Sequence, residues 1–419
     1  MTQTTLPLPS ANSVLPTSSS IRTASRTMAA ALGAAIFLSM LPVTMMVPVL
    51  KEVVADRFSA GSFWVHSFMS INMVGAVLFA PLGGALADRL GRRKPIVIVA
   101  ALVDAALLGL MPKLTTLSSL LIVRFLEGGA HILVVTAIMA MAGDWADPKR
   151  RGAMMGLVGA ALIFGTSCGA PLGGRIGEQA PLLVFFIGAA LSLAVALLAA
   201  AVLREAPIRP ESQRFAGALA MVNRNRRLLV PYAYGFIDRF CVGVIVSTFV
   251  LFLSERHGLS PSGRGGLLAL FLFPFAFLCY PMGRLSDRIG RALPLCLGSL
   301  GFGLVYASYG LLPLSVLPIA MVLSGVLSAV MFSPNLAMCT DLAPENQRAS
   351  VYAGFNVAGS LGFVAGPLIG GLICAVLADP QGSPLPYQAA FIVAGIAEVL
   401  CAALTLPFLL KLRREGCIS

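Results

Sequence analysis

Charged residues are scarce in this chain of 419 residues: Asp, Glu, Lys and Arg make up 11% of it, against about 25% in soluble domains. Hydrophobic residues make up 58%, so a soluble globule of this size would have too few polar side chains to cover its surface. The shortage of charge excludes a soluble globular protein, and the wealth of apolar residues excludes a disordered one. An integral membrane protein is the class that remains.

Several motifs that carry chemistry are also absent. The sequence contains no HExxH and no cluster of histidines, so it lacks the commonest metal constellation of enzymes. It has no GxxxxGK[ST] loop, which argues against a primary pump with its own nucleotide site. We therefore expect no enzymatic activity, no catalytic residue, no metal and no cofactor. Basic residues are spread over short loops, which argues against nucleic-acid binding.

Long apolar runs, in place of ten-residue alternating segments, predict membrane-spanning helices. Residues 1–27 are rich in Ser, Thr and Pro and have no apolar block, so we expect a disordered tail there. Charges, Pro or Gly bound each apolar run of roughly twenty residues. The twelve expected spans are 28–50, 65–87, 95–111, 117–141, 152–174, 181–203, 228–253, 265–282, 293–312, 316–338, 349–377 and 388–410.

The basic residues fall on alternate loops between these spans. If both termini are cytoplasmic, 22 of the 30 Lys and Arg residues lie on the cytoplasmic side and 6 on the other side. Cytoplasmic loops of membrane proteins carry such an excess. The sequence therefore predicts a multi-pass protein of the lipid bilayer, in the cell (inner or plasma) membrane, with both termini cytoplasmic.

The chain contains an internal repeat. Residues 144–174 (DWADPKRRGAMMGLVGAALIFGTSCGAPLGG) align in register with residues 341–371 (DLAPENQRASVYAGFNVAGSLGFVAGPLIGG). Parallel repeats are one of the known transporter architectures, with the substrate site between the halves. We therefore expect an all-α membrane protein with twelve transmembrane helices in two pseudo-symmetric six-helix bundles. Its expected segments are a tail at 1–27, a first half at 28–203, a cytoplasmic linker at 204–227, a second half at 228–410 and a tail at 411–419.

Three motifs lie within or between these spans: GALADRLGRR at 84–93, RFLEG at 124–128 and GFVAGPLIGG at 362–371. They resemble motifs of the major facilitator superfamily, and the resemblance covers residues 28–410. The first is similar to that family's signature loop between spans two and three, and the second is similar to its span-four RxxxG element. GFVAGPLIGG at 362–371 has the form GxxxGPxxGG, which marks span five in exporters of the family. Here span five reads GTSCGAPLGG at 165–174, with its Pro one place late. The resemblance is to twelve-span drug/proton antiporter-type exporters.

Small residues four apart let helices approach closely in lipid, and a Pro removes one helical hydrogen bond. Spans five and eleven carry such residues in matching positions, so we expect both helices to pack tightly and bend. The resemblance implies that they seal the side away from the cytoplasm. The alternative is ordinary small-residue packing. These residues are Gly165, Gly169, Pro171, Gly362, Gly366 and Pro367.

Charges at the cytoplasmic ends of spans predict a gate. Asp88 ends span two, Arg92 lies one helical turn further on, and Asp144 ends span four, so Arg92 can pair with either carboxylate. We expect such pairs to hold the cytoplasmic ends together when the protein faces outward and to break when it faces inward. The alternative is that these charges only set topology. The second half repeats the set as Asp287, Arg291 and Asp341.

Span four carries the most concentrated group of ionisable residues. Arg124, Glu127 and His131 lie at i, i+3 and i+7, so they share one helix face. Each ionised side chain at a helix centre costs roughly 2.5–3.5 kcal/mol on insertion scales, and an imidazole has an ordinary pKa suited to proton exchange. We interpret the group as a proton relay; the alternative is a self-satisfied cluster that ties span four to its neighbours.

Span seven carries Asp238 and Arg239. Adjacent residues point about 100° apart, so the two need not pair. Because the resemblance implies that spans one and seven line the cavity, Asp238 is the best candidate for a proton carrier, and Asn72, Arg239 and Asn356 are candidate substrate contacts. Two further mid-span acids, Asp104 and Glu398, fall on spans that the family places at the periphery, and the sequence assigns them no role.

Together these observations favour a secondary transporter, most simply a proton-coupled exporter of a small organic molecule such as a drug, siderophore or metabolite, acting as a monomer. Protons and the substrate are then its partners. A proton-coupled uptake symporter is the second hypothesis, since only the GPxxGG elements favour export. A non-transporting receptor or membrane enzyme is the third.

Overall fold

The computed structural model describes residues 18–146, 151–205, 225–344, 348–378 and 383–418, and every regular element within them is a helix. The first part contains α1 (Ser18–Met45), η1 (Lys51–Asp56), α2 (Ser62–Leu90), α3 (Lys94–Leu110), η2 (Met111–Lys113), α4 (Leu117–Trp145), α5 (Arg151–Gln179) and α6 (Leu183–Ala201). The second part contains η4 (Arg226–Leu228), α8 (Leu229–Val244), η5 (Ile245–Phe249), α9 (Val250–His257), α10 (Pro261–Ile289), α11 (Ala292–Ser308), α12 (Leu317–Leu342), α13 (Arg348–Val376) and α14 (Leu385–Arg414).

Eleven helices of the described residues are long and apolar enough to cross a membrane. One of them is continuous from Arg226 to His257 and joins η4, α8, η5 and α9. Helix α11 is the twelfth apolar helix and has 17 residues, which gives a length of about 26 Å, close to the ~30 Å hydrocarbon core of a bilayer. The predicted all-helical membrane class is confirmed.

Two helices run beyond the expected spans. Helix α1 begins at Ser18, inside the segment expected to be a tail, and α14 continues to Arg414. Hydropathy marks only the part of a helix that lies in lipid, whereas backbone hydrogen bonds continue through polar residues on either side. The helix ends therefore lie outside the apolar runs.

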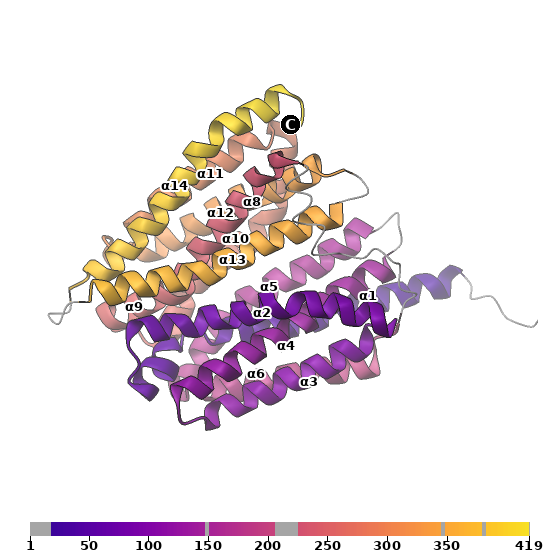
Figure 1. The fold of residues 1–419 in the computed structure, drawn as a ribbon, viewed down its shortest axis with the longest axis horizontal. Coiled ribbons are helices and arrows are strands. Elements are labelled where there is room, and N and C mark those ends of the chain that lie inside the picture. The colour runs from indigo at the N-terminus through magenta and orange to yellow at the C-terminus, as the bar shows by residue number, and fades with distance from the viewer. Residues whose placement is uncertain (1–17, 147–150, 206–224, 345–347, 379–382, 419) are drawn as a thin grey trace, which may run out of the picture.

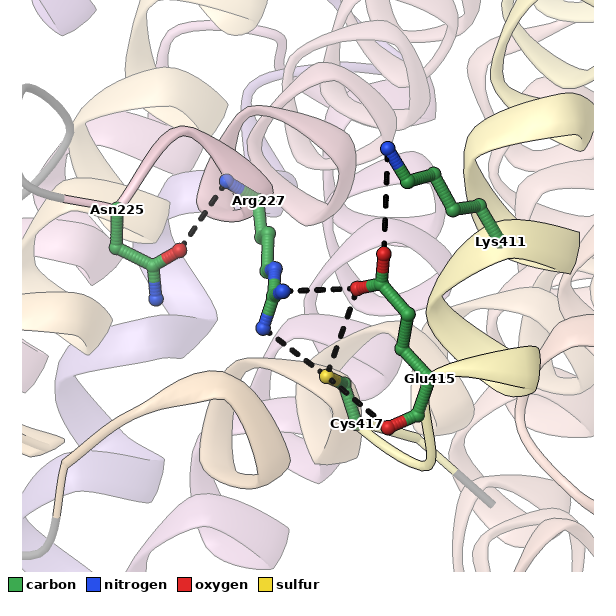
Figure 2. Close-up of polar contacts among 5 residues, drawn as sticks. All are labelled: Asn225, Arg227, Lys411, Glu415 and Cys417. Atoms are coloured by element: carbon green, nitrogen blue, oxygen red, sulfur yellow. Dashed lines mark hydrogen bonds and ion pairs between the residues drawn. The ribbon is translucent and has the colours of Figure 1, made fainter.

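The C-terminal segment folds back onto the start of α8 (Figure 2). Arg227 donates to Glu415 Oε2 at 2.8 Å and approaches the sulfur of Cys417 at 3.0 Å. Ile418 is buried beside them. The last residues, expected to be a tail from residue 411 onward, instead tie the two ends of the second half together.

The two halves use the same helix pairs in the same order. In the first half α5 packs against α1, α4 against α2 and α6 against α3; in the second half α13 packs against α8, α12 against α10 and α14 against α11. Spans five and eleven, which share the sequence repeat, thus occupy equivalent positions in the two halves. The predicted pseudo-symmetric bundles are confirmed.

The halves meet along two helix pairs, α5 with α10 and α2 with α13. Figure 1 shows α2 and α13 close together at the end of the molecule that holds α9, and diverging toward the end that holds the C terminus. We call the end that holds α9 the far end. We call the end that holds the C terminus the linker end, because the chain leaves the first half and enters the second half at that end.

Spans one and seven share an irregularity. The π-helical turn η1 follows α1, and the π-helical turn η5 interrupts the span made by α8 and α9. Such turns are frequent at functional sites, because each leaves one backbone position out of the regular ladder. The two turns lie at the far end of equivalent helices, where the halves meet.

Candidate functional site

The first polar cluster lies on α4, on one face of the helix. Arg124 Nη1 donates to Glu127 Oε2 at 2.7 Å, and the two residues are 1% and 4% exposed. Arg124 also lies over the ring of Phe68, 4.8 Å from its centroid. The spacing of three residues predicted this pair, and burial makes each partner dependent on the other.

Asn72 joins this cluster from α2. Its Nδ2 donates to Glu127 Oε2 at 2.6 Å, so it is a partner of the carboxylate, and its expected role as a substrate contact stays a prediction. The close approach of α2 to α4 depends on glycine. A Cβ on Gly128 would lie 2.0 Å from the carbonyl oxygen of Asn72, and one on Gly75 would lie 2.0 Å from that of Phe125. Helices α2 and α4 therefore touch through their backbones.

This contact makes Gly128 the most sensitive position in the cluster. We expect Gly128→Ala to destabilise the protein by about 1–3 kcal/mol or more, since the added methyl group overlaps backbone that cannot move aside alone. Thermal unfolding of the purified protein would measure the loss. Gly159→Ala is the matched control, because a Cβ there meets nothing within 4 Å. Equal stability of the two variants would contradict the backbone contact.

Two further titratable side chains stand beside Glu127. His131 follows on α4, and Asp104 comes from α3; ligand atoms of these residues and of Glu127 all lie within 4.8 Å of one another. Asp104, to which the sequence assigned no role, is 3% exposed and accepts a hydrogen bond from Ser192 of α6 at 2.5 Å. The expected stripe on α4 is thus part of a cluster drawn from four helices.

Two carboxylates and a histidine are a common ligand set for a metal ion, but the positive charge of Arg124 beside them opposes metal binding. Glu127 Oε2 already accepts from Arg124 and Asn72. A guanidinium at this distance repels a divalent cation. The expectation that the protein holds no metal stays a prediction.

The second polar site lies on α8. Asp238 is 7% exposed, and its Oδ2 lies 3.4 Å from Arg239 Nε. The two side chains therefore do come together, although their backbone positions point apart, because the arginine chain is long enough to bend across. Asp238 Oδ1 is buried without a hydrogen-bond partner. Arg239 also lies over the rings of Phe332 and Phe363, at 5.2 and 5.4 Å.

Glu398, the other acid without an expected role, is fully buried on α14. Ser299 of α11 donates to Oε1, and the sulfur of Cys241 lies 3.6 Å from Oε2. Cys241 sits one turn after Asp238 on α8. Both carboxyl oxygens of Glu398 thus have partners, whereas Asp104 and Asp238 each keep one oxygen without any.

The glycines of spans five and eleven lie against spans one and seven. A Cβ on Gly169 would lie 2.4 Å from the carbonyl oxygen of Leu41, and one on Gly366 would lie 2.3 Å from that of Phe240. Gly165 and Gly362 make the same kind of approach one turn earlier, and Pro171 and Pro367 lie within their helices. The expected bending of these helices stays a prediction. Asn356 is exposed on α13.

Residues 165–169 also spell GxSxG, the pattern of a nucleophilic serine in hydrolases. Ser167 is fully buried in the middle of α5, and its hydroxyl donates to the carbonyl oxygens of Ile163 and Leu272. A nucleophile elbow requires a sharp turn between a strand and a helix. The pattern here is helix packing.

Ion pairs at the linker end join helix ends within one half. Asp144 pairs with Arg93 at 3.0 Å, next to Arg92, which is exposed. In the second half Arg291 pairs with Asp341 at 3.2 Å and with Asp287. The side chain of Asp88 lies outside the described residues. The pairs between described residues do not bridge the two halves, and their expected role in a gate stays a prediction.

Contacts across the halves gather at the far end. Arg264 of α10, 1% exposed, pairs with Glu52 of η1, and His66 of α2 lies 3.0 Å from the hydroxyl of Thr248 in η5. Ser70 of α2 donates to a carbonyl oxygen of α13. The structure is therefore closed at the far end. Sequence reasoning missed Glu52 and Arg264, although two opposite charges beside apolar runs were a signal.

Two like bundles of apolar helices with ionisable groups buried at mid-span define a polytopic membrane protein. A family model described as Major Facilitator Superfamily matches residues 32–237 and 232–416, so the chain belongs to that superfamily. It is a multi-pass membrane protein that transports a small molecule and is not an enzyme.

Relatives match most of the length of this chain. The chain is 23% identical over 351 residues to Multidrug resistance protein 2 of Bacillus subtilis (strain 168), covering 81% of this chain and 86% of that protein. It is 25% identical over 363 residues to the 3-(3-hydroxy-phenyl)propionate transporter of Escherichia coli (strain K12), covering 82% and 86%.

Among solved structures, a bacterial homolog to the human lysosomal transporter Spinster, in an inward-facing and unoccupied conformation, superposes with a TM-score of 0.77. It is 16% identical, and the match covers 93% of this chain and 97% of that one. A mutant of the nucleoside transporter NupG also superposes with a TM-score of 0.77. It is 13% identical, and the match covers 91% of this chain and 99% of that one. These likenesses show the fold.

Proposed function

We propose that the protein exports a small organic molecule across the cell membrane in exchange for protons, by alternating access of one site between the two halves. The observation that carries the proposal is the carboxyl group of Asp238, buried at mid-span with one oxygen unpartnered. A membrane-buried acid with an incomplete set of partners is suited to bind and release a proton as its surroundings change. The cluster of Arg124, Glu127 and His131 is the second candidate proton site.

Export is favoured over uptake by two observations. Span eleven carries the GPxxGG element, and several relatives are named for drug resistance, among them the multi-drug resistance efflux pump PmrA of Streptococcus pneumoniae, 24% identical over 354 residues. Proton-coupled uptake is the second candidate, because the name of the Escherichia coli relative, 3-(3-hydroxy-phenyl)propionate transporter, does not specify export.

The orientation proposed for this function places the linker end in the cytoplasm. The excess of basic residues on the loops of that end supports it, and the closed far end then makes this structure inward-facing. A reporter enzyme that is active only outside the cytoplasm, fused after Arg214, should give no signal. A strong signal would reverse the orientation and, with it, the assignment of the conformation.

Transport in everted membrane vesicles tests the function. The test substrates are tetracycline and a quinolone, because relatives are named for resistance to each. With an acidic lumen, proton flow out of the vesicle should drive the drug into it, faster than in vesicles lacking the protein, and a protonophore should stop this accumulation. Accumulation in right-side-out vesicles under an inward proton gradient would instead identify an uptake symporter. Transport that is unaffected by the pH gradient in either type would contradict proton coupling.

A further inference from the structure

Asp104 is an acid whose position the proposed function leaves unexplained. It lies on α3, a helix that packs against α4 and α6 within the first half, and its side chain is buried. Ser192 donates to Oδ2 at 2.5 Å, but Oδ1 has no hydrogen-bond partner. An unpartnered carboxylate oxygen in a membrane interior is costly, so something further must neutralise this side chain.

The surrounding charges do not balance. The titratable or charged groups that face Asp104 are Arg124, Glu127 and His131, all from α4. Helix α6 contributes the neutral Ser192 and α2 the neutral Asn72. With a neutral histidine, two carboxylates stand against one guanidinium, and that guanidinium is already bound to Glu127 at 2.7 Å. The cluster is one positive charge short.

We propose that Asp104 and Glu127 form a carboxyl pair that holds one exchangeable proton, with Ser192 orienting Asp104 and Arg124 keeping the other member of the pair ionised. Two carboxyl groups a few ångströms apart cannot both ionise at low cost, and one shared proton removes the repulsion. The proton leaves when the pair ionises, and His131, within 4.8 Å of both acids, is the neighbouring acceptor.

The second half contains a buried acid, Glu398, that has no second carboxyl group as a hydrogen-bond partner. Glu398 is fully buried, as Asp104 nearly is, and it too takes a hydrogen bond from a serine, Ser299, on the partner helix. Its other oxygen, however, faces the thiol of Cys241. Glu398 is a single acid without an arginine or a second carboxyl group among its hydrogen-bond partners, and it serves as the matched control.

The use of this proton in transport rests on the proposed function, whereas its binding does not, and infrared spectroscopy can measure binding alone. Difference spectra of the purified full-length protein between acidic and alkaline buffers should contain the carbonyl band of a protonated carboxylic acid from the pair. Asp104→Asn and Glu127→Gln should each remove the same one-proton band, because a single remaining acid is ionised by Arg124. Asp104→Glu should keep it.

The controls make the outcome decisive. Glu398→Gln should leave the pair's band in place, and combining it with Asp104→Asn should add the two spectral changes. If Asp104→Asn and Glu127→Gln remove two different bands, the acids bind protons independently and the pair does not exist. Absence of the pair's band from these difference spectra would indicate acids whose protonation does not change between the two buffers, and a band abolished by sodium at constant pH would indicate a sodium site. Each of these results would overturn the proposal.

The failure of this proposal can be told from the failure of the function. If the shared band is present and both variants remove it, but wild-type vesicles show no transport driven by a pH gradient, the pair stands and proton coupling fails. If transport is driven by the gradient and the band is missing, the coupling proton is held elsewhere, and the pair fails.

Discussion

Asp238→Asn should abolish accumulation driven by a pH gradient while leaving exchange of substrate down its own gradient. Asparagine keeps the size and most of the hydrogen bonding of the carboxyl group but cannot ionise. Since Asp238 is buried, with one oxygen unpartnered and Arg239 at 3.4 Å, the substitution removes the protonation cycle and preserves the shape. The measurement is tetracycline or quinolone uptake into everted vesicles, with an imposed gradient and without one.

Glu398→Gln is the control for this experiment. Glu398 is equally deep in the second half, but both of its oxygens have partners, so its neutral variant should retain transport driven by the gradient. Full gradient-driven transport by Asp238→Asn would exclude this residue as the proton carrier. Loss of both driven and passive transport would mean that Asp238 holds substrate or structure.

Glu52→Gln should open the far end of the protein. The Glu52 and Arg264 side chains connect η1 of the first half with α10 of the second, and Arg264 keeps Nε and Nη1 without partners. Once Glu52 is neutral, the buried guanidinium is better solvated in the open state. Hydrogen bonds to charged groups contribute about 1.5–3 kcal/mol, which corresponds to a shift of roughly tenfold to a hundredfold in the ratio of closed to open molecules.

Labelling of a buried cysteine would measure this shift. Thr248→Cys places a thiol at a fully buried position in η5, beside His66. In a background without the native cysteines, a membrane-impermeant maleimide should label it faster when Glu52→Gln is added. Lys51→Gln is the neighbouring control, since its pair with Asp56, at 3.8 Å, is partly exposed and contributes little. Equal labelling rates for the Thr248→Cys parent, its Glu52→Gln variant and its Lys51→Gln variant would contradict the idea that the Glu52–Arg264 pair keeps the far end closed.

Reversing the pair gives an independent check. The double variant Glu52→Arg with Arg264→Glu restores opposite charges, so its labelling rate should return toward that of the parent, while either single reversal leaves two like charges together. Failure of the double variant to recover would show that the surrounding backbone, and not the charge pair, keeps the far end closed.

The sequence was sufficient for the architecture because the bilayer restricts the possibilities. Lipid admits a spanning chain only with its backbone hydrogen bonds satisfied, so twenty-residue apolar runs predict helices, and a repeat predicts two like bundles. Local spacing also predicted the contact of Arg124 with Glu127, since residues three apart lie on one helix face. Helix ends were less accurate: α1 and α14 extend past their apolar runs into polar residues.

What only the tertiary structure decided is which polar residues on different helices meet. Asp104 and Ser192 are 88 residues apart and Glu52 and Arg264 are 212 apart, and nothing in the hydropathy of either segment identifies the other. Helices in lipid associate through side-chain fit, glycine contacts and a few hydrogen bonds, which are not periodic in the sequence. The composition thus determined that the chain crosses the membrane in helices, while the lateral packing of those helices determined where its buried charges find partners.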